Sequence, residues 1–334
     1  MIDRLNALNE RRHPAGIKDR RLSAGRLFVH MMFKKCLLIV VIFLLLQLIG
    51  GIFLVEITVH VPRKHLAKAA EDQSQTIANQ LKAIKSSVEI KTEDGILLKA
   101  WCFQPPTTHP DAVVLLHGVG NNRAGMMGYI RLFLQHGFLV LDPDMREHGE
   151  SEGQISTYGI LEKRDVHQWI DWLTIKYKPV HIYVLGESMG AAILLQSLPS
   201  EDRFTAVAAE CPFATFPEIA FDRVGQTFGT TDWLGRTLLR PLVEFAFAYS
   251  RLRYGLNFRN ISPLMGVANS RTPVLLIHGI EDDNIPIRHS ELMLGIHRAG
   301  VELWEVPRAN HSNAFGKYPA EYERRVMVWF VPHS

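Results

Sequence analysis

The chain has 334 residues, of which 47% are hydrophobic and 21% charged, a composition that excludes wholesale disorder and collagen-like structure. Its three cysteines are too few for a disulfide framework, and no paired Cys/His spacing indicates a metal site. The net charge of +3 is too small to indicate nucleic-acid binding. It is unevenly distributed, because residues 1–35 alone carry a net charge of +6.

A run of 20 residues without a charged side chain, Cys36–Val55, directly follows this basic segment, and Gln47 is its one polar side chain. At about 1.5 Å per residue, a helix of that length spans about 30 Å, the thickness of the hydrocarbon core of a membrane. A buried helix of a soluble domain would show a polar stripe, and a signal peptide would have a shorter apolar run. The run therefore favours a retained transmembrane helix over residues 36–55.

The charges on the two sides of this helix predict its orientation. Nine Lys or Arg residues precede it, whereas only Arg63, Lys64 and Lys68 follow it closely. The positive-inside rule then keeps residues 1–35 in the cytoplasm and places the rest of the chain on the non-cytoplasmic side, which is the periplasm in a bacterium. The bilayer is thus a predicted partner.

Residues 56–86 are polar and rich in Ala and Gln, which predicts a stalk, followed by a domain of residues 87–334. In that domain short apolar runs alternate with helical stretches, which predicts an α/β fold with a mostly parallel, doubly wound sheet. The turn Glu93-Asp94-Gly95 makes the first two strands an antiparallel edge. Strands are predicted at 88–92, 96–103, 112–116, 138–141, 181–185, 206–209, 274–277 and 301–306, and helices at 158–177, 191–198 and 319–330.

The alternation stops between residues 213 and 262, where two helical pieces separated at Gly225–Gly229 are predicted. A long insertion between two strands of such a sheet usually covers the carboxyl ends of the strands, where α/β folds bind ligands. Residues 213–262 therefore predict a helical cap over a binding site.

The sequence Gly186-Glu-Ser188-Met-Gly190 lies between a predicted buried strand and a predicted helix. A strand that turns sharply into a helix lifts one side chain above the sheet edge, and glycines two residues to either side keep neighbouring backbone from colliding. The free N–H groups at the helix N-terminus favour negative charge that develops at the serine. Ser188 is therefore the predicted nucleophile, with Gly186 and Gly190 supporting the turn.

A serine hydroxyl needs a base to activate it, and the base needs an acid to orient it. Three candidate acids, Glu281, Asp282 and Asp283, follow the strand predicted at 274–277. The candidate base, His311, lies in a loop after the last predicted strand. Serine, acid and histidine thus occur in the order typical of a triad built on a strand-turn-helix nucleophile.

The oxyanion formed in such a reaction needs two preorganised donors, which are usually backbone N–H groups. Met189 is predicted to supply one, and Val119, in the turn after the third predicted strand, the other, with Gly118 supporting the turn. A dinucleotide-binding loop is the alternative interpretation of Gly118-Val-Gly120. The next glycine falls at Gly125, however, so the GxGxxG spacing is absent.

Together these stretches resemble the α/β-hydrolase superfamily over roughly residues 87–330. Asp144–Ser151 is similar to the family's D-x-R-G-x-G-x-S turn, with Glu147 where a glycine is usual. The stretch from His278 to Pro286 matches the family's HGxxDxx[VI]P motif, which selects Asp282 as the acid. The resemblance implies an α/β-hydrolase fold and two-step acyl transfer that needs no metal or cofactor. It is closest to membrane-anchored serine hydrolases of the esterase/lipase-like or serine-peptidase-like branch.

The resulting prediction is a membrane-anchored serine hydrolase that cleaves a carboxylic ester, with a small-molecule or lipid substrate. A serine peptidase of the aminopeptidase kind, with the same fold, is the alternative among enzymes. It needs a site for a charged terminus or an extended backbone, which the cap does not identify. The alternative of another class is a catalytically inactive, membrane-tethered binding protein. The sequence leaves the oligomeric state open.

Overall fold

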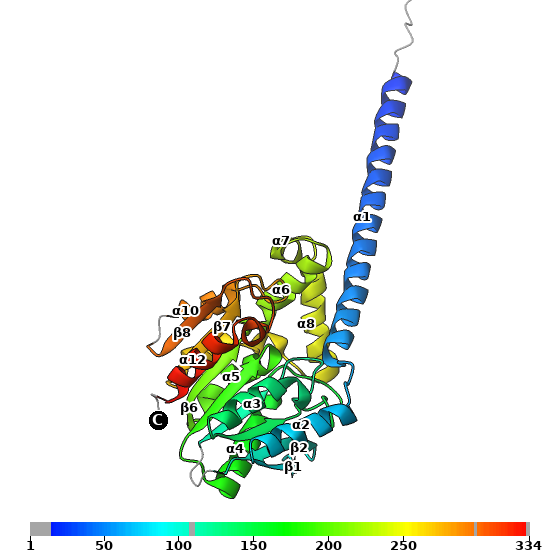
Figure 1. Cartoon of the computed structure of the whole chain (residues 1–334). Helices are drawn as coiled ribbons and strands as arrows, with labels where there is room; N and C mark the ends of the chain where they lie inside the picture. Colours follow the sequence, from blue (N-terminus) through cyan, green and yellow to red (C-terminus); the bar gives the residue numbers. More distant parts are fainter. Residues whose placement is uncertain (1–14, 107–110, 297–298, 332–334) are drawn as a thin grey trace, which may run out of the picture.

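The computed structural model of the chain describes residues 15–106, 111–296 and 299–331. Its longest helix, α1 (Ala15–Val59), projects from an α/β domain (Figure 1). Residues 26–59 are long and apolar enough to cross a membrane, and side chains such as Leu38 and Ile39 are well exposed, unlike those of a core helix. The helix extends beyond the predicted span 36–55 at both ends. Residues 1–14 of the predicted basic segment lie outside the described residues.

The domain is built on an eight-stranded sheet with the order β1-β2-β4-β3-β5-β6-β7-β8. β1 pairs with β2 and β2 with β4 in antiparallel fashion, and all other neighbouring pairs are parallel. The predicted α/β fold, with a mostly parallel sheet and an antiparallel first edge, is therefore confirmed. The strands are β1 (Ile84–Lys91), β2 (Leu97–Gln104), β3 (Ala112–Leu116), β4 (Leu139–Pro143), β5 (Ile182–Glu187), β6 (Phe204–Glu210), β7 (Val274–Gly279) and β8 (Val301–Val306).

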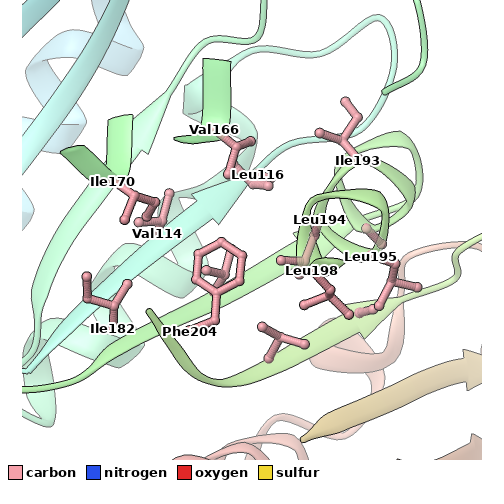
Figure 2. Close-up of a cluster of buried hydrophobic side chains, with 14 of the residues drawn as sticks. Val114, Leu116, Val166, Ile170, Ile182, Ile193, Leu194, Leu195, Leu198 and Phe204 are labelled. Carbon is pink, nitrogen blue, oxygen red and sulfur yellow. The ribbon is translucent and has the colours of Figure 1, made fainter. Parts of the chain in front are cut away.

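Helices cover both faces of the sheet because successive side chains of its central strands are buried on opposite sides. In β3, Val114 and Leu116 belong to one core cluster, and Val113 and Leu115 to the other. Figure 2 shows the first cluster, where the β3 side chains meet those of α4 and α5. The first face is covered by α4 (Glu162–Tyr177), α5 (Met189–Ser197), α9 (Pro263–Ala268) and α10 (Arg288–Leu294), and the second by α2 (Lys68–Gln80), α3 (Met127–Gln135), α11 (Ala314–Lys317) and α12 (Pro319–Phe330).

The predicted cap contains three helices instead of two: α6 (Phe216–Thr227), α7 (Asp232–Arg236) and α8 (Arg240–Tyr254). The break between α6 and α7 falls at the predicted position, and Gly229 adopts a φ of 66° there. A third apolar cluster joins the cap to the end of α1, through residues such as Val55 and Val59.

The prediction of a stalk at residues 56–86 is wrong, because part of this segment packs into the domain. Residues 68–80 form α2, which buries Ile77 and Ala78 against the second core cluster, and β1 begins at Ile84, before the predicted domain boundary. Ahead of α2, the Arg63 guanidinium donates to the carbonyl oxygens of residues 149, 151 and 153. The segment has the polar composition of a stalk because few of its apolar side chains take part in these contacts. The residues that it contacts are distant in the sequence, so the composition did not reveal the contacts.

Most other boundaries shift by a few residues. The helix predicted at 158–177 begins only at Glu162, because its carboxylate accepts hydrogen bonds from Thr157 N, Thr157 Oγ1 and Gly159 N at 2.6, 2.5 and 2.7 Å. Those bonds hold the preceding residues in a turn.

Candidate active site

Ser188 stands between β5 and α5, at the carboxyl end of the central strand. Its φ of 52° and ψ of −114° are strained for a residue with a side chain. The Ser188 N–H donates to the carbonyl of Glu210 at 2.8 Å, and its own carbonyl accepts from Ala192 N at 3.0 Å. These bonds hold the sharp turn, and the side chain is 8% exposed.

The glycines on either side of Ser188 are required by space. A Cβ on Gly190 would lie 2.1 Å from the carbonyl oxygen of Leu116, and one on Gly186 would lie 2.7 Å from Ala191 N. Real Cβ atoms do not approach backbone so closely. The missing side chain at Gly190 lets the start of α5 touch the end of β3, and the missing side chain at Gly186 lets β5 turn directly into α5.

The structure brings the predicted serine, histidine and acid together from three loops at the same edge of the sheet. His311 Nε2 lies 2.8 Å from Ser188 Oγ, and His311 Nδ1 lies 2.8 Å from Asp282 Oδ2. A carboxylate can only accept, so Nδ1 carries the proton and Nε2 is left to accept from the serine hydroxyl. Glu281 and Asp283 are both exposed.

Asp282 is held as a charged group although it is buried. Burial opposes ionisation, but it is outweighed by His278, whose Nε2 lies 3.4 Å from Asp282 Oδ2, and by the hydrogen bond from His311. Together they lower the pKa of Asp282 well below its usual range. The backbone N–H groups of Asn284 and Ile285 also donate to Oδ1, at 3.0 and 2.8 Å. An anion fixed in this way stabilises a positive charge on His311.

The turn after β3 lies against the nucleophile, and His117 fixes it. His117 Nε2 accepts from Met145 N at 3.0 Å, so its Nδ1 donates to the carbonyl oxygen of Gly118 at 2.9 Å. Burial, followed by the neighbouring charge of His148, lowers the pKa of His117 to about 3, so it stays neutral.

The direction of the next N–H follows from that bond. The two groups of a trans peptide point in opposite directions, so anchoring the Gly118 carbonyl fixes where the Val119 N–H points. Met189 is the first residue of α5. Among the described residues, no backbone group outside the regular helices and strands accepts a hydrogen bond from the N–H of Val119 or of Met189.

A cavity of about 390 Å³ opens beside Ser188. That volume falls in the range of small-molecule sites. Its floor includes Ser188, Met189 and Val119, so the predicted nucleophile and both predicted oxyanion donors face one space. The walls are mainly apolar and come from the cap helices α6 and α8 and from the end of α1: Leu54, Val55, Ile57, Ile219, Val224, Val243, Ala246 and Phe247.

A pair of carboxyl groups near the nucleophile, half-buried Glu187 and buried Glu210, was not predicted from the sequence. The Tyr129 hydroxyl lies 2.6 Å from Glu187 Oε1 and 3.0 Å from Glu210 Oε2, and Tyr322 donates to Glu210 at 2.9 Å. Burial, followed by the charge of the partner carboxyl, raises the pKa of Glu187. Glu210 also accepts from Ala314 N at 3.0 Å, which ties the network to the segment after His311. The signal that could have revealed this pair is that each glutamate is the last residue of an apolar strand, β5 or β6.

Among the described residues, Cys211, His278 and Asp282 place their donor atoms within 4.8 Å of one another. This cluster does not fit a metal centre. Both nitrogens of His278 are occupied by Ser290 Oγ and the Ile285 carbonyl, at 2.7 and 2.8 Å. Burial raises the pKa of the Cys211 thiol well above its usual value, and Asp282 already serves His311.

Glu147, the departure from the family's usual turn, adopts a φ of 66°. Glycine adopts a positive φ without strain, which explains why the family usually has glycine at this position. In this chain the Glu147 carboxylate accepts a hydrogen bond from Arg63 at 3.2 Å. The departure therefore ties the turn to the segment that follows α1.

The α/β hydrolase family model matches residues 113–325, and the chain belongs to this family. Over 248 residues it is 32% identical to YqkD of Bacillus subtilis, an uncharacterised protein, covering 73% of this chain and 78% of that one.

Two solved structures show what kinds of enzyme share the fold. The esterase Pf2001 of Pyrococcus furiosus aligns with a TM-score of 0.65 and 25% identity, covering 81% of this chain and 97% of that one. An acylaminoacyl peptidase of Pyrococcus horikoshii aligns with a TM-score of 0.56 and 19% identity, over 76% of this chain and 42% of that one, which supports the fold alone.

Proposed function

We propose that the protein is a serine hydrolase that cleaves carboxylic esters with an apolar acyl group. The observation that carries the proposal is the continuous chain of hydrogen bonds from Asp282 through His311 to Ser188, which ends at the floor of an apolar cavity. An activated serine beside such a cavity suits acyl transfer from an ester.

In the proposed mechanism, His311 Nε2 takes the proton of Ser188 Oγ as the oxygen attacks the ester carbonyl carbon. The N–H groups of Val119 and Met189 hold the resulting oxyanion, and Asp282 stabilises the protonated His311. His311 then gives the proton to the departing alcohol, leaving an acyl group on Ser188. Water, deprotonated by His311, repeats the attack and releases the acid.

The lining of the cavity favours an ester over a peptide with a free amino terminus. Among the described residues that line it, none is Asp or Glu, and Arg223 is the one charged side chain. An amino terminus would be bound by a carboxylate, which that lining lacks. A peptidase with a blocked or internal substrate is the second candidate, favoured by the fold shared with the acylaminoacyl peptidase.

We further propose that α1 anchors the protein in a membrane with the enzyme domain on the non-cytoplasmic side. The support is the exposed apolar side chains between Leu27 and Leu46 and the excess of basic residues before residue 36.

The test uses the full chain in detergent micelles with a fluorophosphonate probe, which reacts with activated serines. Labelling is expected in the natural protein and in Ser200→Ala, which removes an exposed serine far from the site, and is expected to be lost in Ser188→Ala. A panel of p-nitrophenyl esters and of free and acylated aminoacyl anilides then separates esterase from peptidase. Folded protein that takes no label would favour an inactive binding protein instead.

A further inference from the structure

The last turns of α1 are part of the cavity that holds the nucleophile. Leu54, Ile57 and Thr58 line it from one side, and Val243, Ala246 and Phe247 of α8 line it as well. A helix that served only as an anchor would not need to reach the site. Figure 1 shows the end of α1 running beside α8 before the chain turns into the domain.

Two glycines allow this close packing. A Cβ on Gly51 would lie 2.8 Å from the Leu242 carbonyl oxygen and 2.9 Å from Ala246 N, and one on Gly50 would lie 3.0 Å from Leu242 Cδ1. Small residues let two helix backbones approach closely. One turn earlier, Gln47 is buried although most neighbouring side chains of α1 are exposed, so the same face of the helix is covered there too.

Hydrogen bonds fix α1 to the cap and to the domain. The Glu56 carboxylate accepts from the hydroxyl groups of Tyr249 at 2.7 Å and Tyr254 at 2.8 Å, both on α8. On the domain side, the Tyr158 hydroxyl donates to the Thr58 carbonyl at 3.0 Å, and Ser156 N donates to the Val59 carbonyl at 2.8 Å. The end of α1 is thus held from two sides at the level of the cavity.

We infer that the end of α1 is a wall of the acyl-binding site, so that the membrane helix itself selects the acyl chain of the substrate. The inference rests on the proposed function, because it concerns the acyl group that Ser188 would accept. The ligand class is a linear acyl chain that lies in the cavity lined by α1, α6 and α8. Leu54 and Ile57 are the residues that set how much of the chain fits.

The test compares substitutions on two faces of α1 in the full chain. Ile57→Trp adds bulk at a residue that lines the cavity although it is 51% exposed, whereas Ile49→Trp places the same ring at a residue that is 63% exposed and does not line the cavity. The measurement is kcat/KM for p-nitrophenyl dodecanoate relative to p-nitrophenyl acetate. Each excluded methylene weakens apolar binding about fourfold, so Ile57→Trp is expected to lower the ratio about tenfold or more. Ile49→Trp is expected to leave it unchanged.

A second variant acts in the opposite direction. Leu54→Ala enlarges the cavity and is expected to raise the ratio of hexadecanoate to octanoate turnover. Fluorophosphonate labelling of Ser188 monitors the proposed function separately, because it needs no long acyl chain. A ratio that changes equally in Ile57→Trp and Ile49→Trp would overturn the inference.

Binding without turnover separates the inference from the proposed function. In a Ser188→Ala background, a fluorescent dodecanoyl ligand is expected to bind, and adding Ile57→Trp is expected to weaken binding about tenfold, at the same fourfold per methylene. If the natural protein takes no fluorophosphonate label but this difference persists, the function fails and the acyl site stands. Equal binding with and without Ile57→Trp would contradict the inference that the end of α1 is a wall of the acyl-binding site. Comparing the turnover of an ester supplied in vesicles with that of the same ester supplied as monomers shows whether the acyl chain enters from a membrane or from solution.

Discussion

Glu187, the residue before the candidate nucleophile, shares the hydroxyl group of Tyr129 with Glu210, at 2.6 and 3.0 Å. Two carboxyl groups bridged by one hydroxyl cannot both be ionised at low cost in a buried site. The pKa of Glu187 is raised by burial and then by Glu210, so this carboxyl keeps a proton that the unfolded chain has lost.

This relationship predicts how stability depends on pH. A raised carboxyl pKa in the folded state means that the folded chain binds more protons than the unfolded one above the ordinary glutamate value of about 4.3. Stability therefore falls as the pH rises above that value. Glu187→Gln, which keeps the shape but cannot ionise, is expected to raise the melting temperature at pH 8 and flatten its decrease between pH 5.5 and 8. Exposed Glu281→Gln is the control. Equal slopes for all three proteins would contradict the prediction.

Asp282→Asn is expected to lower kcat by about 10⁴ without unfolding the protein, because an amide no longer fixes the tautomer of His311. The measurement is single-turnover acylation with a p-nitrophenyl ester, with circular dichroism to show that the fold persists. Residual activity within tenfold of the natural protein would mean that another acid serves His311.

His117→Phe is expected to lower kcat about tenfold or more while changing KM little. The Gly118 carbonyl then keeps only the longer hydrogen bond from Asn121 N, at 3.3 Å, and the Val119 N–H is held less firmly in its direction. Complete loss of one oxyanion donor costs about 10²–10³ in rate, which sets the upper bound. His136→Phe, on the surface and bonded to Glu323, is the matched control. A rise in KM with unchanged kcat would point to substrate binding instead.

Gly190→Ala and Gly118→Ala are expected to behave differently. The first would place a Cβ 2.1 Å from a backbone oxygen, so soluble folded protein should not be obtained. The second would place a Cβ 3.4 Å from Ser188 Cβ and 3.7 Å from the Glu187 carbonyl oxygen, so it should fold and lose turnover selectively. Expression and unfolding curves followed by labelling kinetics measure both. Recovery of folded Gly190→Ala would show that the turn after β3 can move.

Local patterns predicted the sheet and the candidate triad because each depends on short segments. The strand at 112–116 and the helix at 319–330 are observed with the predicted limits, since continuous apolar runs and proline mark them. The glycines around Ser188 likewise follow from one turn of backbone. The stalk was mispredicted because Arg63 and α2 are held by carbonyl groups and apolar side chains far along the chain.

Sequence patterns were enough to predict the α/β-hydrolase fold, the candidate residues Ser188, Asp282 and His311, and an apolar helix long enough to cross a membrane. Each of these is encoded in a contiguous motif or a compositional run. No sequence pattern indicated that Glu187 and Glu210 share Tyr129, that His117 directs the Val119 N–H, or that α1 forms a wall of the cavity. The carboxyl pair and the α1 wall join residues separated by tens to more than a hundred positions, and the orientation of His117 depends on Met145 N, 28 positions away. They arise from the packing of whole helices and strands, which no local pattern records.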